Sequence, residues 1–178
     1  TILFVDLVGF TAKSSERTPQ EVIAFLNDLF TEFDLLATKH GVEKIKTLGD
    51  SYMAAAGLPK LQSNHPQRIA HFAIDMIEAA RKFSETMGED FKLRVGFHSG
   101  PAVAGVIGTE KPFYDVWGDT VNMASRLESH GKTDFIQVTR ATKNLLADQF
   151  TFCRRGNVAM KGKGTQEVWY LTGHRPKA

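Results

Sequence analysis

The chain has 178 residues, 42% of them hydrophobic, and a formal net charge of +2, which provides for one well-buried core and predicts a single domain over residues 1–178. The near balance of charge argues against nucleic acid or an anionic membrane as a direct partner, and no apolar run approaches the roughly 20 residues that span a bilayer. The single cysteine, Cys153, rules out a disulfide within the chain and suits a reducing compartment.

The first elements in chain order are a strand and a long helix. Residues 2–5 form an uninterrupted apolar run, typical of a strand that is buried on both faces. A capping box follows, with Thr18 as N-cap, Pro19 at the first helical position and Glu21 reaching back. Gly41 marks the end of this helix, because glycine readily adopts the left-handed conformation found just after helix ends.

A strand pair, a second helix and another strand come next. Residues 43–48 and 52–56 predict two short strands joined by a tight turn. A second amphipathic helix starts near Pro66 and ends before Gly88, and residues 92–98 alternate cleanly between apolar and polar, as in a half-buried strand.

The last third of the chain adds elements to this core. Residues 102–107 predict a returning strand, one helix begins at Asp119 and a fourth follows Thr139. Residues 150–154 and 167–171 predict a closing hairpin. The order β-α-β-β-α-β with C-terminal extras predicts an α+β fold of the ferredoxin-like type, with an antiparallel-rich sheet covered by helices.

Two aspartates stand at positions suited to metal binding. Asp6 lies where the first strand runs out, and Asp50 lies in the turn of the strand pair. Either one alone is more simply a strand-ending or turn-forming residue. The predicted topology, however, places the first strand beside the hairpin, so both carboxylates come to one edge, where they could hold hard divalent cations beside a triphosphate.

A second group of polar residues lies around the third predicted helix. Asp119 is a candidate N-cap, which puts Asn122 and Arg126 four residues apart on one face. Such a pair is usually a solvated helix face. Here it follows residues 114–117, an aromatic-rich loop around Asp115 that is suited to line a pocket, so both interpretations stay open.

Four further residues carry weaker signals. Strand alternation sends Lys44 and Lys46 to the same face, so one of them can be a solubility residue. Lys161 lies in a Lys-Gly-Lys-Gly loop, a weak phosphate-binding cue when taken alone. Cys153 has no neighbouring base and is expected in the core of a strand.

Six segments occur in an order that narrows the interpretation. They are residues 4–11 (FVDLVGFT), 43–50 (EKIKTLGD), 94–100 (RVGFHSG), 114–119 (YDVWGD), 121–126 (VNMASR) and 161–164 (KGKG). Together they resemble the class III nucleotide cyclase catalytic domain, most closely the bacterial adenylate cyclases that work as homodimers. The resemblance covers nearly the whole chain. It implies one cyclase catalytic domain over residues 1–178, with the palm-type sheet of that family.

The resemblance also implies the roles of individual residues. Asp6 and Asp50 match the metal-binding aspartates, with help from the Leu7 carbonyl, for two Mg²⁺ or Mn²⁺ ions per active site. The remaining matches form three sets: Phe10, Thr11, Arg94 and Lys161 at the triphosphate; Lys46 and Asp115, with the neighbouring Val116, at the purine; Asn122 at the ribose and Arg126 at the transition state.

The family places each active site across a dimer interface, and this chain retains both complements. A symmetric homodimer with two equivalent sites is therefore implied. Adenine has an amino group that can donate a hydrogen bond to Asp115 and a ring nitrogen that can accept one from Lys46. ATP is therefore the expected substrate. Guanine has the opposite pattern.

Two alternatives to an adenylate cyclase are a guanylate cyclase and a non-catalytic nucleotide-binding module. Guanylate cyclases carry an acidic residue where Lys46 stands, and a non-catalytic nucleotide-binding module would have lost Asp6, Asp50, Asn122 or Arg126. None of these four is lost. Because the sequence begins in mid-strand without methionine, we expect an excised cytoplasmic catalytic domain, whose parent protein could carry membrane-anchoring or sensor segments.

Overall fold

The structure, a computed structural model, describes residues 1–10, 14, 17–88 and 90–176. Its elements are β1 (Ile2–Val8), α2 (Pro19–His40), β2 (Glu43–Leu48), β3 (Ser51–Ala55), α3 (His65–Met87), β4 (Lys92–His98), β5 (Val103–Ile107), β6 (Phe113–Trp117), α4 (Asp119–Ser129), β7 (Ile136–Thr139), α5 (Arg140–Leu146), β8 (Phe150–Met160) and β9 (Gly164–His174). None of the described helices combines the length and the apolar content that crossing a bilayer requires.

One sheet organises the molecule. Its seven strands run in the order β2-β3-β1-β4-β7-β9-β8, and every neighbouring pair is antiparallel except β4 and β7. Strand β1 lies between β3 and β4, so the residues at its end meet side chains from both neighbours. This α+β arrangement with a mostly antiparallel sheet was predicted from the sequence.

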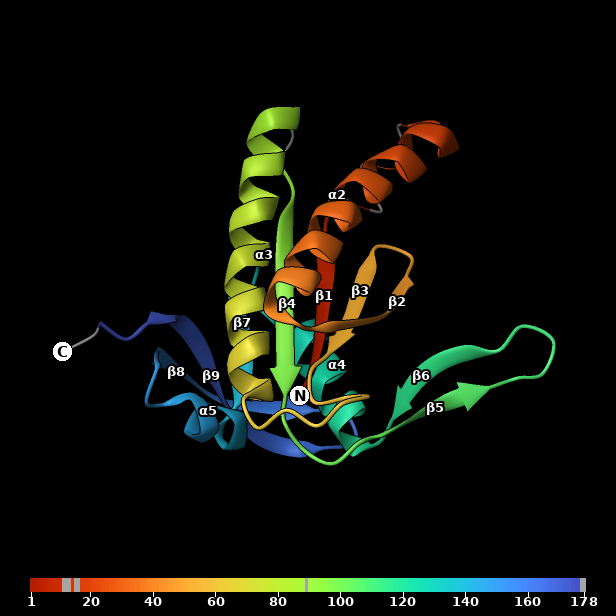
Figure 1. Ribbon diagram of the computed structural model, residues 1–178. Coiled ribbons are helices and arrows are strands. Elements are labelled where there is room, and N and C mark those ends of the chain that lie inside the picture. The colour runs from red at the N-terminus through yellow and green to blue at the C-terminus, as the bar shows by residue number, and fades with distance from the viewer. Residues whose placement is uncertain (11–13, 15–16, 89, 177–178) are drawn as a thin grey trace.

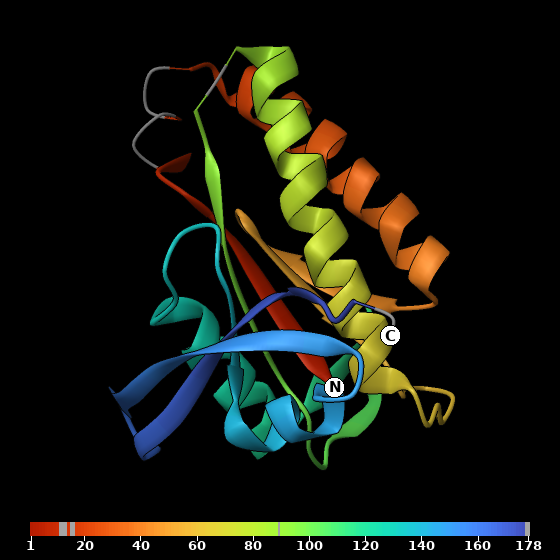
Figure 2. The same cartoon turned by 90° about the vertical axis from the view of Figure 1, so that its left-hand side faces the viewer.

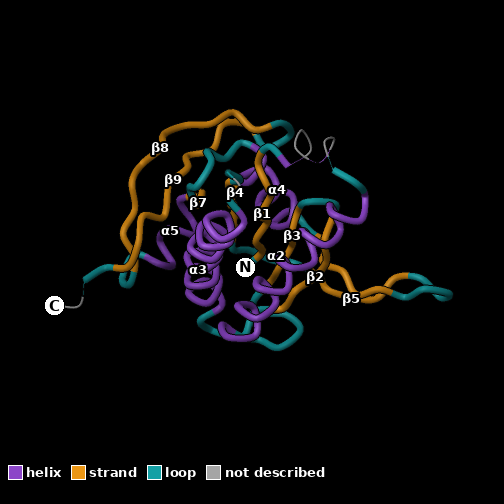
Figure 3. The backbone as a smooth tube through the Cα atoms, turned by 90° about the horizontal axis from the view of Figure 1, so that it is seen from above, coloured by secondary structure: helices purple, strands orange, loops and turns teal. Residues whose placement is uncertain are grey.

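Helices cover the two faces of the sheet unequally. The long helices α2 and α3 pack on one face, as Figures 1 and 2 show, and they bury the larger core, which includes Leu3, Phe33 and Phe72. Seen from above, α4 lies on the opposite face (Figure 3), over a smaller core that contains Phe4 and Ala124. The alternation of side chains along β1 supplies both cores.

The start of α2 follows the local sequence signal. The Thr18 hydroxyl accepts a hydrogen bond from the Glu21 amide, and the Glu21 carboxylate accepts one from the Thr18 amide at 2.8 Å. Gly41 ends the helix with a φ of 61°, which favours glycine. The predicted capping box is therefore confirmed. The N-cap of α4, by contrast, is Gly118, so Asp119 is the first helical residue and the predicted cap was wrong by one position.

The segment around Asp115 is a strand and not the predicted loop. Strand β6 pairs with β5 to form a separate two-stranded sheet, in which Asp115 lies opposite Gly105. Figure 1 shows this hairpin, hereafter the projecting hairpin, extending away from the body of the molecule. The aromatic residues obscured the strand pattern. Strand β7 was also missed, because its four residues are too few for a periodic signal.

Three other expectations need correction. A β-bulge between Lys44 and Lys46 changes the register of β2 against β3. The two side chains therefore point to opposite faces of the sheet, Lys44 toward Asp34 and Lys46 toward Asp115. The closing hairpin β8–β9 is longer than predicted, and the Lys-Gly-Lys-Gly segment is its turn. Cys153 is exposed on β8, the edge strand, and not in the core.

Candidate active site

Asp6 lies near the end of β1, where both of its neighbouring strands reach its carboxylate. The backbone register places Ser51 of β3 and Arg94 of β4 directly across from it. The Ser51 hydroxyl donates to Oδ1 of Asp6 at 2.8 Å, and the Arg94 guanidinium donates to Oδ2 at 2.6 Å. Both carboxylate oxygens of Asp6 therefore accept a hydrogen bond from a neighbouring strand.

Asp50 lies in the β2–β3 turn, beside Ser51. Burial raises the pKa of the Asp50 carboxyl, and the nearby negative charge of Asp6 raises it further. The two carboxylates are thus close enough to repel each other, as predicted from the topology. A divalent cation between them would relieve this repulsion.

The donor chemistry at this edge fits hard cations. Asp6 and Asp50 supply carboxylate oxygens, the donors that Mg²⁺ and Mn²⁺ prefer. Within residues 1–10, 14, 17–88 and 90–176, no three His, Cys, Asp or Glu side chains form a metal-binding cluster. Mg²⁺ commonly binds one or two carboxylates and takes its other ligands from water and substrate phosphates, so two aspartates suit a substrate-linked ion.

Glu128 is a third carboxylate at this position, and the sequence analysis missed it. It is on α4, and its Oε1 accepts a hydrogen bond from Nε of Arg94 at 3.1 Å. Burial raises the pKa of Glu128 to about 7, with a further contribution from the charge of Asp6. Hereafter Asp6, Asp50 and Glu128 are called the acidic group.

The close approach of α4 to the sheet explains why Glu128 reaches this position. A Cβ atom on Gly96 of β4 would lie 2.2 Å from the backbone nitrogen of Glu128. Only glycine therefore allows the end of α4 to rest directly on β4. The sequence signal for this contact was Gly96, two residues after Arg94. It became informative only once the position of α4 was known.

Lys46 and Asp115 form the pair that the sequence analysis assigned to the purine. The Lys46 ammonium lies 2.5 Å from Oδ2 of Asp115, whose side chain is only 7% exposed. The Val116 amide donates to Oδ1 of Asp115 at 2.8 Å, while the Val116 side chain is buried in the smaller core. Both oxygens of Asp115 are thus oriented, and one donor and one acceptor stand side by side.

A cavity of about 370 Å³ brings together the remaining predicted residues of α4 and the β8–β9 turn. Its lining residues are Asn122, Ser125, Arg126, Lys161, Gly162 and Lys163, hereafter the cationic pocket. The helical spacing of Asn122 and Arg126 does place both on one face. Ser125 and Lys163 were not predicted as site residues.

The charges of the cationic pocket are largely uncompensated. Lys163 pairs with the exposed Asp119, but in the part of the chain that the structure describes neither Arg126 nor Lys161 has a carboxylate partner. None of the acidic group lines this cavity. The pocket is therefore suited to an anion that comes from outside the chain, such as a phosphate chain.

Three predicted residues contribute differently or stay untested. The Phe10 side chain is buried and stacks on Phe25 with ring centroids 5.4 Å apart, so only its backbone could contact a ligand. Thr11 lies outside the described residues. The Leu7 side chain is in the larger core, and the role of its carbonyl stays a prediction.

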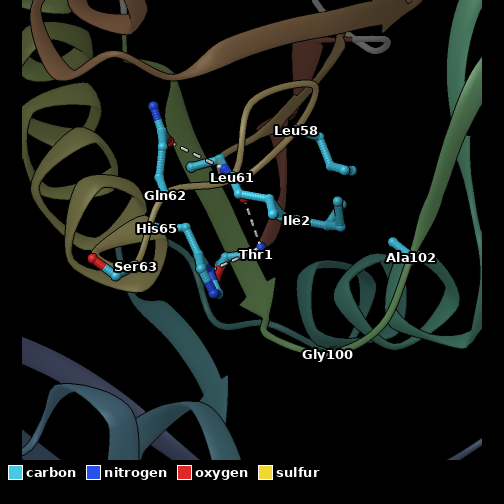
Figure 4. A pocket seen from close by; sticks show the side chains of 11 residues that line it. Thr1, Ile2, Leu58, Leu61, Gln62, Ser63, His65, Gly100 and Ala102 are labelled. Carbon is cyan, nitrogen blue, oxygen red and sulfur yellow. Dashed lines mark hydrogen bonds between the residues drawn. The ribbon is translucent and has the colours of Figure 1, made fainter.

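A cavity larger than the cationic pocket lies elsewhere. It has a volume of about 510 Å³ and is lined mainly by the start of β1 and the segment before α3, with Leu58, Leu61 and Ala102 around it (Figure 4). It contains no residue of the acidic group or of the cationic pocket. A choice of site by cavity size alone would therefore have missed the residues that carry charge and hydrogen-bonding capacity.

Comparisons with known proteins agree with this geometry. A family model described as the adenylate and guanylate cyclase catalytic domain matches residues 1–173. An adenylate cyclase of Mycobacterium tuberculosis is 44% identical over 178 residues, which are 100% of this chain and 40% of the relative. A receptor-type guanylate cyclase of Drosophila melanogaster is 44% identical over 184 residues, which cover 100% of this chain and 12% of the relative.

A solved structure extends the agreement to three dimensions. The crystal structure of the guanylate cyclase domain of RhGC from Catenaria anguillulae, in complex with GTP, matches with a TM-score of 0.94 at 35% identity. The match covers 98% of this chain and 96% of that one. The predicted cyclase fold is thereby confirmed, while the chain spans less than half the length of either relative named above.

Proposed function

Because the chain belongs to the adenylate and guanylate cyclase catalytic domain family, we propose that it is an adenylate cyclase, which converts ATP to 3′,5′-cyclic AMP and pyrophosphate. Relatives of both substrate classes match it at 44% identity, so overall similarity does not select the base. The observation that carries the proposal is the contact between Lys46 and the buried carboxylate of Asp115.

The polarity of this pair favours adenine. Asp115 can accept a hydrogen bond from the exocyclic amino group, and Lys46 can donate to the ring nitrogen. Guanine presents an acceptor and a donor in the reverse order, so its polar groups would be left unpaired against these two side chains. Buried unpaired polar groups allow discrimination of up to about 10⁴-fold.

The split of the charged residues supports a site that is shared between two copies. The acidic group and the cationic pocket lie in different parts of one chain. The acidic group offers carboxylates for the metal ions and the cationic pocket offers positive charges for the phosphates, so each supplies only half of what a metal-bound triphosphate needs. A twofold homodimer would bring the acidic group of one protomer against the cationic pocket of the other, and would do so twice.

The projecting hairpin supplies a surface for such a dimer. Four of its apolar side chains are more than half exposed: Val103, Val106, Ile107 and Phe113. Figures 1 and 3 show the outer end of the hairpin standing clear of the helices and the main sheet, while its base packs on the smaller core. Apolar side chains gathered on an exposed element are typical of an interface, and a second copy provides the same surface in return.

The chemistry follows from the charges at hand. Asp6 and Asp50, with the Leu7 carbonyl, would hold two Mg²⁺ or Mn²⁺ ions, which when bound supply Lewis-acid activation of the ribose 3′-hydroxyl and neutralise the leaving phosphates. Asn122 orients the ribose for in-line attack on the α-phosphorus. Arg126 stabilises the negative charge that builds on the α-phosphoryl oxygens.

Two more cations act on the leaving group. Lys161 of the cationic pocket and Arg94 beside Asp6 bind the oxygens of the departing pyrophosphate from the two protomers. We place the domain in the cytoplasm, where ATP is available and where its single free cysteine stays reduced.

A substrate comparison tests the proposal. Cyclic nucleotide formation should be measured with ATP and with GTP, each with Mg²⁺ and with Mn²⁺, on the dimeric protein. We expect cyclic AMP formation to exceed cyclic GTP formation by at least about 10²-fold in kcat/KM. A preference for GTP would make the protein a guanylate cyclase, and no product from either would contradict the enzymatic role.

A further inference from the structure

Arg94 lies between two carboxylates that belong to different elements. Its terminal nitrogen donates to Oδ2 of Asp6 at 2.6 Å, and its Nε donates to Oε1 of Glu128 at 3.1 Å. Because the Ser51 hydroxyl occupies the other oxygen of Asp6, no side-chain oxygen of Asp6 is left without a partner. Arg94 thus balances the negative charge of Asp6 within the chain.

This arrangement conflicts with metal binding at Asp6. A divalent cation needs the carboxylate oxygen that the guanidinium now contacts, and the two positive groups repel each other at such short range. For the cation to bind, Arg94 must turn away from Asp6. A displaced guanidinium in a half-buried position needs another anionic acceptor, because leaving it unpaired costs free energy.

Glu128 is that acceptor by position. Its side chain is 11% exposed, and among the described residues Arg94 is its only ion-pair partner. The direct packing of α4 on Gly96 fixes the Glu128 backbone against β4, which also carries Arg94. A buried carboxylate that loses its one cationic partner pays a desolvation cost. Glu128 therefore stays paired with Arg94 when Arg94 leaves Asp6.

We infer that Glu128 is a positioning residue that draws Arg94 away from Asp6 and thereby sets the affinity of the site for divalent cations. The inference rests on the metal role proposed for Asp6 above. It assigns to Glu128 a function through Arg94 and no direct contact with the substrate or the metal. Arg94 correspondingly acts as an internal competitor of the cation until the site is filled.

A double-mutant cycle on metal affinity tests this inference. The binding of Mn²⁺ alone, without nucleotide, is measured by electron paramagnetic resonance at pH 8, on wild type, Glu128→Gln, Arg94→Gln and the double variant. Asp6→Ala gives the background of binding elsewhere, and circular dichroism verifies that each variant is folded. Turnover is not used, so the readout is independent of catalysis.

The expected pattern has two parts. Glu128→Gln weakens Mn²⁺ binding about 3- to 10-fold, because the neutral amide leaves Arg94 more firmly on Asp6. Arg94→Gln tightens Mn²⁺ binding by a similar factor, because it removes the competing cation. In the Arg94→Gln background, the effect of Glu128→Gln shrinks to less than about twofold.

Different failures have different meanings. If Glu128→Gln weakens binding equally in both backgrounds, Glu128 acts only through its own charge and the inference is overturned. If Arg94→Gln does not tighten binding, Arg94 is no competitor, which overturns the inference even should the Glu128 variant fail to fold. If wild type binds Mn²⁺ no better than Asp6→Ala, both the inference and the proposed metal role fail.

Discussion

The acidic group and the cationic pocket differ in how their charges are satisfied. At the acidic group, Asp6 is paired twice within the chain, with Ser51 and Arg94, and Glu128 shares the same arginine. In the cationic pocket, Arg126 and Lys161 have no carboxylate partner among the described residues. The charges of the acidic group are paired within the chain, whereas the cationic pocket can accept an anion from outside it.

This difference indicates how the two regions depend on their ligands. The acidic group must exchange an internal cation for a divalent one, so its state depends on metal and pH. The cationic pocket needs no internal rearrangement before it receives phosphate oxygens. A triphosphate with its metal ions satisfies both at once, which is why we assign the two regions of opposite charge to a single site between two protomers.

The largest effect is expected in the cationic pocket. Arg126→Ala should lower the turnover number on ATP about 10³-fold, because it removes the charge that stabilises the transition state. The measurement is cyclic AMP formation at saturating ATP. Arg81→Ala, on the exposed face of α3, is the matched control and should leave turnover nearly unchanged. Retention of more than about a tenth of the activity by Arg126→Ala would remove this residue from the mechanism.

The next effect concerns Lys46 and Asp115, the pair proposed to contact the purine. Lys46→Glu should lower the ATP-to-GTP ratio of kcat/KM at least about 10²-fold, because the donor to the adenine ring nitrogen becomes an acceptor. Lys44→Glu is the control, since the β-bulge turns Lys44 to the other face, where it pairs with Asp34. Equal changes in both variants would mean that the ratio responds to charge in general and not to the purine contact.

The third effect concerns the contact that joins the two regions. Gly96→Ala should lower the free energy of unfolding by about 1–3 kcal/mol, because the added methyl group meets the backbone of α4 and forces the helix off β4. Urea denaturation measures the change. Gly105→Ala is the control, because its Cβ would meet the nearest atom at an ordinary 3.7 Å. Equal stability of the two variants would contradict the close packing of α4.

The smallest effect concerns the pH dependence of the acidic group. The pKa of Glu128 is raised, first by burial and then by the charge of Asp6, from its ordinary 4.5 to about 7. Folding therefore favours the neutral form, and this stabilising contribution is complete below pH 4.5 and is lost as pH rises through 7. Glu128→Gln should consequently stabilise the metal-free protein at pH 8 by about 1–2 kcal/mol, and less at pH 5.

Thermal unfolding at both pH values measures this difference. The exposed Glu78→Gln on α3 is the control and should change stability by no more than about 0.5 kcal/mol. A destabilised Glu128→Gln at pH 8 would mean that the ionised carboxylate contributes more through Arg94 than it loses by burial.

The parts of the molecule that sequence predicted well depend on local signals. The capping box of Thr18 and Glu21 was readable because its partners are three residues apart, and the strand that contains Asp6 was readable from the unbroken apolar run before this residue. Asp50 was placed beside Asp6 because the predicted topology fixed the neighbours of β1. The remaining site residues were predicted from the sequence motifs that resemble those of the cyclase family and that occur in a fixed order.

What the sequence did not reveal depends on packing between distant segments. Glu128 looked like an ordinary helix residue until α4 was seen resting on Gly96. The bulge that separates Lys44 from Lys46 breaks the strict alternation on which the prediction relied. Strand β6 was hidden because its aromatic residues obscured the strand pattern, and because it pairs with β5 outside the main sheet.

Mixing two inactive variants tests most directly whether sites are shared between copies. Asp6→Ala and Arg126→Ala chains should each be inactive alone, and after subunit exchange the mixture should recover about a quarter of wild-type activity, since half of the dimers would carry one intact site of two. Recovery at this level would support a site built from the acidic group of one protomer and the cationic pocket of the other. No recovery, with exchange verified by differently tagged chains, would contradict it.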